Sequence, residues 1–156
     1  MRTVLLASPL LLVLAACGSS SDGGDAPGKP PISIAQGQAA KVRVAESDLG
    51  PILVDASGRT LYAFTKDKEG QSNCDESCIA VWPALSGKTR AEAGNGVDKA
   101  LLKGLRQAEG SVQTSYGDWP LYYYVGDAVA GDVNGQGLDG EWFVIDGRGK
   151  LVRKTS

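Results

Sequence analysis

The sequence predicts a mainly β (α+β) fold: a single small domain of two pseudo-equivalent halves, each containing a β-hairpin, with one or two short helices. The first observation is a repeat with a period of sixty residues, since LYAFTKD at residues 61–67 recurs as LYYYVGD at residues 121–127. The second is a series of short apolar runs bounded by Gly, Asp, Asn and Pro. The same offset also aligns Gly50 with Gly110, Ile52 with Val112, Trp82 with Trp142, and Gly87 with Gly147.

The N-terminus indicates export and lipid anchoring. Arg2 precedes an apolar stretch over residues 4–14, which is shorter than the about 20 apolar residues of a transmembrane helix. The stretch ends in Leu-Ala-Ala-Cys, which resembles a bacterial lipobox, so we expect residues 1–16 to be a cleaved signal peptide and Cys17 to be lipidated. The lipid on Cys17 would hold the protein on the extracytoplasmic face of a bacterial cell membrane. An ordinary signal peptide that happens to contain a cysteine is the alternative.

Composition separates a tether from a folded domain. Residues 17–38 begin with the lipidated cysteine and are dominated by Gly, Ser, Asp, Pro and Ala, so we expect a flexible tether. Residues 39–156 are long enough for a hydrophobic core and are expected to form one domain of two tandem repeats, approximately 39–97 and 98–156. The net charge is −2 and no basic stripe is present, so we expect no nucleic-acid partner.

In the first half, we expect three strands and a short helix. Residues 41–44 alternate polar and apolar side chains, which is typical of a half-buried strand. Apolar runs at residues 52–54 and 60–64 flank a segment rich in turn residues, and this arrangement predicts a hairpin. A helix is expected over residues 76–81, and it should end before the proline that follows closely.

The second half repeats the hairpin and adds another. A helix is expected over residues 97–105, where three leucines follow helical spacing. Residues 112–116 and 119–125 are expected to form the hairpin that is equivalent to the first one. A last hairpin should join residues 142–145 to residues 150–153 through a Gly-rich turn.

The chain contains no histidine, and this absence excludes several kinds of site. It removes His-based acid–base catalysis, Ser-His-Asp triads, His-ligated haem and the common zinc sites. No Gly-rich phosphate loop follows a strand and opens a helix, so nucleotide binding has no support either. We therefore expect no cofactor and no metal.

Two cysteines remain after lipidation of Cys17, and we expect Cys74 and Cys78 to form a disulfide in an oxidising compartment. On a regular helix, residues four apart hold their Cβ atoms about 5–6 Å apart, whereas a disulfide needs about 3.8 Å. The segment should therefore be a turn or a distorted helix start. The alternatives are a redox-active pair and a metal site, whose further ligands would come from Asp67, Asp75 and Glu76.

The repeated Tyr-x-aromatic-x-x-Asp pattern supplies the candidate ligand-binding residues. Residues two apart on a strand share a face, so Tyr62 lies with Phe64, and Tyr122 lies with Tyr124. Each aspartate follows its strand, where a carboxylate can accept hydrogen bonds from turn N–H groups. One interpretation is structural, with aromatic pairs packed between the halves, and the other is a pseudo-symmetric ligand site. The candidate residues are Tyr62, Phe64, Asp67, Tyr122, Tyr124, Asp127 and, beside a turn, Trp119.

The two motif copies resemble the Yx(FWY)xxD motif of a family of predicted bacterial lipoproteins, which is also described as a secreted repeat of unknown function. The resemblance covers residues 41 to about 149, nearly the whole domain, and Asp118 departs from the small polar or amide residue expected there. It implies a lipoprotein and brings no reaction, because the family is defined without one. Supporting matches are Gly58-Arg59-Thr60-Leu61-Tyr62, Cys74, Cys78, Trp82-Pro83, Trp119-Pro120-Leu121-Tyr122-Tyr123 and residues 131–137.

Three functions are compatible with these residues. The first is a non-catalytic module, anchored through Cys17, that binds an envelope component, a small molecule or a protein partner. An apolar pocket with few polar groups would support it, and a solid interface between the halves would count against it. The second is a redox or metal-handling envelope protein that uses Cys74 and Cys78, which a free, exposed thiol pair would favour. The third is a hydrolase that uses the carboxylates of Asp67 and Asp127, and it fails if backbone groups satisfy them.

Overall fold

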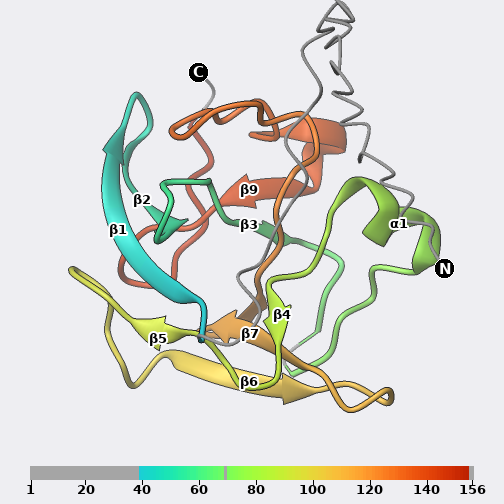
Figure 1. The fold of residues 1–156 in the computed structure, drawn as a ribbon. Coiled ribbons are helices and arrows are strands. Elements are labelled where there is room, and N and C mark those ends of the chain that lie inside the picture. The colour runs from blue at the N-terminus through green and yellow to red at the C-terminus, as the bar shows by residue number, and fades with distance from the viewer. Residues whose placement is uncertain (1–38, 69, 155–156) are drawn as a thin grey trace, which may run out of the picture. The chain divides into compact units, whose positions relative to one another are not determined.

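The computed structural model describes residues 39–68 and 70–154, and in these ranges the chain is mainly β with one short helix (Figure 1). The predicted signal peptide, lipidated Cys17 and tether lie outside the described residues. Within the described part of the chain, no helix is long and apolar enough to cross a membrane. The elements are β1 (Lys41–Ser47), β2 (Gly50–Asp55), β3 (Tyr62–Phe64), α1 (Glu76–Val81), β4 (Ser86–Gly87), β5 (Glu92–Ala93), β6 (Leu102–Arg106), β7 (Val112–Tyr116), β8 (Trp119–Pro120), the 3-10 turn η1 (Leu138–Gly140) and β9 (Trp142–Val144).

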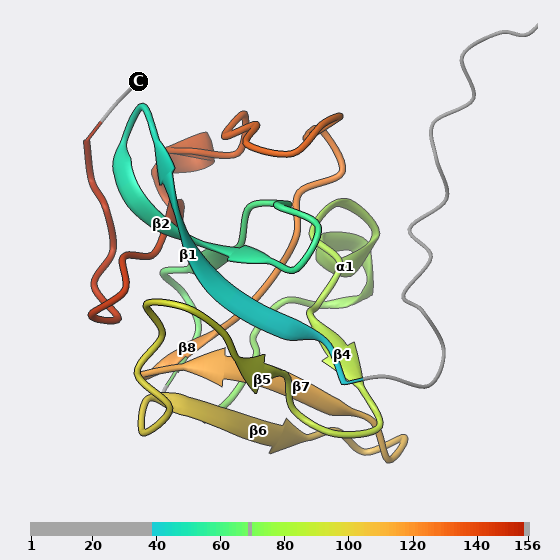
Figure 2. The same cartoon turned by 60° about the vertical axis from the view of Figure 1, so that its left-hand side comes forward.

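The strands within residues 39–68 and 70–154 form three small sheets (Figure 1, Figure 2). One has the order β2-β1-β5, the second has the order β4-β7-β6 with β8 also on β7, and the third joins β3 to β9. β1 and β2 form a tight hairpin in which Ser47 lies opposite Gly50. Gly50 has a φ of 98°, a conformation that glycine adopts without steric cost, and the Ser47 hydroxyl donates to its carbonyl over 2.7 Å.

Five strands expected from the sequence are found as β1, β2, β3, β7 and β9, and the expected helix over residues 76–81 is α1. Two expected hairpins are only partly formed. β2 meets the segment that follows it at a single bridge between Val54 and Thr60, and a single bridge between Ile145 and Leu151 follows β9. β2 instead pairs along its length with β1, the first strand of the domain.

The strand expected over residues 119–125 is shorter in the structure and is confined to β8. The chain beyond it forms bridges with two neighbours, but each pairing is only one residue long. Tyr122 bridges to Tyr62 on one side and to Ala84 on the other. This segment therefore lies in a central position between the two repeat halves, and it links them without forming a long ladder.

The prediction of a helix over residues 97–105 is wrong. Residues 97–101 form turns, and Leu102 begins β6, which pairs antiparallel with β7. A helix this short is marginal on its own, and Gly104 would weaken it further. The strand gains a backbone ladder with β7 and buries Leu102, while Leu101 packs against the same core from the turn. The leucines therefore reach the core from two elements instead of from one helical face.

The two repeat halves interlock. β3 from the first half pairs with β9 from the second, and Phe64 lies opposite Trp142. The equivalent pairing on the other side joins Tyr122 of the second half to Ala84 of the first. β4 of the first half also pairs with β7 of the second. Strands of each half therefore pair with strands of the other half. The tyrosines of both motifs meet at the centre of this arrangement.

Candidate functional site

Tyr62 on β3 and Tyr122 beyond β8 lie opposite each other where the two halves meet. The backbone N–H of Tyr62 donates to the carbonyl of Tyr122 over 2.9 Å, and the reverse bond is 3.0 Å long. This pair is antiparallel, so the two motif copies run past each other in opposite directions. A pseudo-twofold axis therefore passes between the two tyrosines and relates the residues of one copy to those of the other.

The tyrosine hydroxyls cross between the two motif copies. Tyr62 donates to Oδ2 of Asp127 over 2.8 Å, and Tyr122 donates to Oδ2 of Asp67 over 2.7 Å. Each tyrosine thus bonds to the aspartate of the other copy and not to its own. A buried phenol needs an acceptor for its proton, and the crossed pairs provide one for each ring.

The second oxygen of each aspartate holds a turn. The N–H of Asn73 donates to Oδ1 of Asp67 over 2.7 Å, and the N–H of Asn134 donates to Oδ1 of Asp127 over 3.0 Å. Each asparagine side chain also donates to a carbonyl just before its aspartate, over 2.7 Å in the first copy and 3.2 Å in the second.

Neither asparagine is among the candidate site residues predicted from the sequence. Asn73 follows Asp67 by six residues, whereas Asn134 follows Asp127 by seven, so the pair falls outside the sixty-residue offset. The signal that could have found them is an asparagine in the polar loop after each motif aspartate, where such side chains commonly bond to turn backbone. A search that allowed one inserted residue between the copies would have aligned them.

Burial dominates the electrostatics of these pairs. Desolvation raises the pKa of Asp127 to about 6, although hydrogen bonds from Tyr62 and from a backbone amide favour its carboxylate form. Desolvation also raises the pKa of Asp67 against two opposing hydrogen bonds. The pKa of each tyrosine is raised as well, first by burial and also by the facing carboxylate. Both phenols therefore stay protonated at neutral pH and act as donors.

Four aromatic rings stack in a continuous column within the same core cluster. Trp82 and Trp142 form its centre, with ring centroids 3.8 Å apart and planes 2° apart. Phe64 stacks on Trp142 at 4.3 Å, and Tyr124 stacks on Trp82 at 4.4 Å. This order follows the repeat, because Phe64 aligns with Tyr124 and Trp82 aligns with Trp142. Both tryptophans are buried, so their rings belong to the core and present no open face to a ligand.

The structure brings six of the seven candidate ligand-binding residues together and places Trp119 with the other core cluster. Trp119 is half-buried there. Among the six, both motif tyrosines are fully buried, Asp67 is 9% exposed, and Tyr124 and Asp127 are half-buried. Such a packed interface counts against a ligand pocket between the halves. A backbone amide donates to the carboxylate of Asp67 and another to that of Asp127. This is the arrangement in which a hydrolase that uses these two carboxylates is expected to fail. The six are Tyr62, Phe64, Asp67, Tyr122, Tyr124 and Asp127.

Both motif copies lie inside segments that match one protein family. Residues 43–86 and residues 105–146 match the family described as a secreted repeat of unknown function. The chain belongs to this family. No match was found among curated proteins or among solved structures. The family's name describes a lipoprotein, which agrees with an extracytoplasmic protein, and its two matched segments correspond to the two interlocked halves.

The cysteines of this secreted-repeat protein form the expected disulfide, with Cα atoms 5.2 Å apart. Cys74 lies just before α1, and the N-cap Asp75 accepts from the N–H of Cys78 over 2.9 Å, so the segment is a helix start. Both cysteines are half-buried against the aromatic cluster. Among the described residues, no group of three or more His, Cys, Asp or Glu could hold a metal ion. Nothing in this arrangement favours redox or metal-handling chemistry.

Proposed function

We propose that the protein is a lipid-anchored, non-catalytic binding module on the extracytoplasmic face of a bacterial membrane. The observation that carries the proposal is that the hydroxyls of both motif tyrosines and the carboxylates of both motif aspartates are hydrogen-bonded at the interface between the halves. Both tyrosine hydroxyls and both oxygens of each aspartate are bonded within the protein. Groups engaged in this way hold a scaffold in one shape, and they are not poised to act on a substrate.

Anchoring rests on the sequence and on the family. Cys17 ends a lipobox-like Leu-Ala-Ala-Cys after an apolar stretch, and the family is named for lipoproteins. A lipoprotein cysteine carries several acyl chains, and two or more chains give stable membrane attachment. Residues 18–38 would then separate the folded domain from the membrane surface by a Gly-, Ser- and Pro-containing linker.

The proposed partner is an envelope component, a small molecule or a protein that docks on the outside of this scaffold. A rigid surface loses less conformational entropy on binding than a mobile one. The crossed tyrosine–aspartate bonds and the disulfide both favour such rigidity, because they connect the loops after each motif to the core.

Anchoring is tested by expressing the full chain in a bacterium that is fed an alkyne-tagged fatty acid. We expect the wild-type protein to carry the label and to sediment with membranes, and the variant Cys17→Ser to lose both properties. The matched control is Cys74→Ser, which also removes one cysteine but leaves the lipobox intact and should keep the label. A label that survives Cys17→Ser, or a wild-type protein found in the cytosol, contradicts the proposal.

Binding is tested on the same material by native mass spectrometry after gentle release from membranes. We expect extra mass in the native state that disappears on denaturation, in the wild type and equally in the variant Asp127→Asn. Equal adducts are expected because the proposed partner docks outside the motif. Loss of the adduct only in Asp127→Asn would place binding at the motif, and no adduct in any sample would argue against a binding module.

A further inference from the structure

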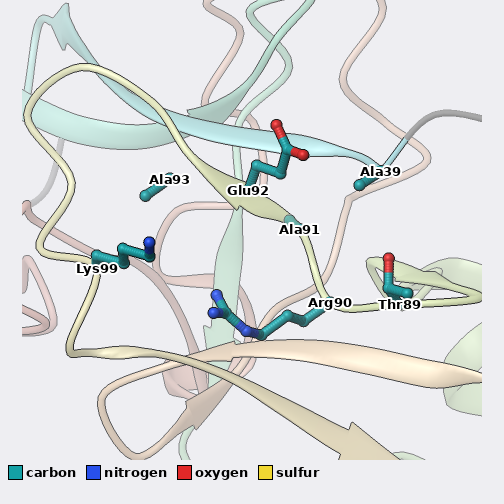
Figure 3. Close-up of a pocket in the computed structure, with 7 residues that line it drawn as sticks. All are labelled: Ala39, Thr89, Arg90, Ala91, Glu92, Ala93 and Lys99. Atoms are coloured by element: carbon teal, nitrogen blue, oxygen red, sulfur yellow. The ribbon is translucent and has the colours of Figure 1, made fainter.

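A hollow of about 480 Å³ opens beside β5, and none of its lining residues belongs to either motif (Figure 3). It lies at the end of the domain formed by β5 and β6, opposite the C-terminal end (Figure 1). Its charged lining residues are Arg90, Glu92 and Lys99, and the uncharged ones are Ala39, Thr89, Ala91 and Ala93. The volume falls in the range of about 300–1,000 Å³ that is usual for ligand sites.

Two cationic side chains in this hollow point toward each other, and these are Arg90 and Lys99 (Figure 3). The stem of Arg90 lies over Gly104, since a Cβ built on that glycine would lie 3.2 Å from Arg90 Cβ and 3.8 Å from its Cδ. Glu92 points away, toward Ala39 (Figure 3). Among residues 39–68 and 70–154 the one ion pair joins Lys66 to Glu141, so neither Arg90 nor Lys99 forms an ion pair there.

Most of the residues that line the hollow lie between the two segments that match the family. Residues 87–104 lie between the two family-matched segments, and they contain four basic and two acidic residues. The whole chain is acidic by comparison, with a net charge of −2. The positive charge is therefore concentrated in the segment that joins the two family-matched copies. An anion is attracted to such a site in proportion to its charge.

We propose that this hollow binds a phosphate group. Arg90 offers the planar fork that pairs with two phosphate oxygens, and Lys99 adds a point charge from the opposite side. The hollow is larger than a phosphate ion, so the phosphate belongs to a larger molecule, either a membrane lipid headgroup or a soluble or polymeric phosphate compound. This inference rests on the proposed function, because the predicted tether ends in the sequence just before Ala39, which lines the hollow.

The test uses the full mature chain, residues 17–156, with Cys17→Ser to prevent lipidation, at constant ionic strength. Backbone amide shifts are followed by NMR during titration with inorganic phosphate. We expect saturable shifts confined to residues 89–99. In the variant Arg90→Gln/Lys99→Gln, affinity should fall at least tenfold. The matched control is Arg153→Gln/Lys154→Gln, which removes the same charges near the C-terminal end and should change affinity less than twofold.

Vesicle flotation separates the two sources of phosphate. Binding to phosphatidylglycerol but not phosphatidylcholine vesicles, with loss in Arg90→Gln/Lys99→Gln, supports the proposal and assigns a lipid headgroup. Phosphate-induced shifts without vesicle binding support it and assign a soluble or polymeric phosphate. The proposal is overturned if phosphate shifts no amide at residues 89–99, or if both double variants weaken binding equally. Fatty-acid labelling of Cys17 is measured separately, so a normal label with no phosphate binding overturns this inference and not the anchoring.

Discussion

The tyrosine–aspartate hydrogen bond is buried for Tyr122 and Asp67 and partly buried for Tyr62 and Asp127. Leaving a buried polar group without a partner costs about 1–3 kcal/mol, and a buried carboxylate costs more. Tyr62 and Asp127 satisfy each other, as do Tyr122 and Asp67, and in both pairs the partners come from opposite halves. The motif therefore links the two halves in both directions, because the loss of one residue removes a hydrogen-bond partner from a residue of the other half.

The raised pKa of Asp127 predicts a pH dependence of stability. Burial raises this pKa from 3.8 to about 6 in the folded protein, so between these values the folded state holds a proton that the unfolded state has released. Protonation thus stabilises the fold, and the free energy of unfolding should fall as pH rises from 4 to 7. We expect this contribution to be about 1–2 kcal/mol, after discounting for a half-exposed site.

The measurement is urea unfolding at several pH values for the wild type and for Asp127→Asn. The wild type should lose stability relative to the variant between pH 4 and pH 7. Asp118→Asn is the control, because Asp118 is exposed in a turn, and it should keep the wild-type pH slope. If Asp127→Asn also keeps that slope, Asp127 is not the titrating group.

At the residue scale, the sequence identified the motif residues but not their partners. The spacing shows that Tyr62 precedes Asp67, and the pleat shows which side chains share a face, but neither indicates that Tyr62 bonds to Asp127 instead. That choice depends on how the halves approach each other. Asn134 was missed for a related reason, because one inserted residue hides its equivalence to Asn73.

At the scale of elements, α1 depends on its surroundings. It has only six residues and no buried side chain, and a helix this short does not persist alone. Asp75 caps its first turn through the N–H of Cys78. The disulfide joins that turn to Cys74, and both sulfur-bearing residues pack against the aromatic cluster. The cap and the crosslink together fix the segment that carries Trp82 into the core.

Removing the disulfide should destabilise the protein without changing its fold. Cross-linking two residues four apart closes a short loop, and the loop formula gives about 2 kcal/mol for such a closure. We expect Cys74→Ser/Cys78→Ser to lower the free energy of unfolding by that amount, which lowers the urea midpoint while the slope of unfolding stays unchanged. Wild-type protein in strong reductant should match the double variant. Equal stability of oxidised and reduced protein would show that the crosslink has no structural role.

Strands were easier to predict than the second helix. Short β-branched and aromatic runs between turn residues correctly indicated β1, β2, β3, β7 and β9, because such runs fit a pleated and half-buried surface. Around Leu101 and Leu102 the same reasoning failed. Their spacing fits a helix, but pairing with β7 satisfies the backbone of β6 and buries Leu102 at once. A non-local ladder overrode a local pattern, and the sequence offers no sign of that partner.

At the scale of the whole molecule, the repeat predicted two halves but not their exchange of partners. β3 pairs with β9 of the other half, and Tyr122 pairs with Ala84 in the equivalent way. A sequence repeat does not indicate whether each copy closes on itself or on its neighbour, because both arrangements bury the same residues. Residues 87–104 join the two family-matched segments and supply most of the lining of the cationic hollow.

The stacked tryptophans at the centre of this arrangement should be energetically coupled. Trp82 comes from the first half and Trp142 from the second, and their rings are nearly parallel at 3.8 Å. Aromatic pairs contribute about 0.5–1.5 kcal/mol beyond the area they bury. In a double-mutant cycle by urea unfolding, Trp82→Phe and Trp142→Phe should therefore show a coupling of about 0.5–1.5 kcal/mol.

The matched control pairs Trp82→Phe with Trp119→Phe. Trp119 packs with the other core cluster, so these two changes should add within about 0.5 kcal/mol. Coupling for the first pair alone would mean that the halves recognise each other through the ring column as well as through the crossed tyrosine–aspartate bonds. Additive effects for both pairs would mean that each tryptophan only fills volume within its own half, and the crossed bonds would then be the main link between the halves.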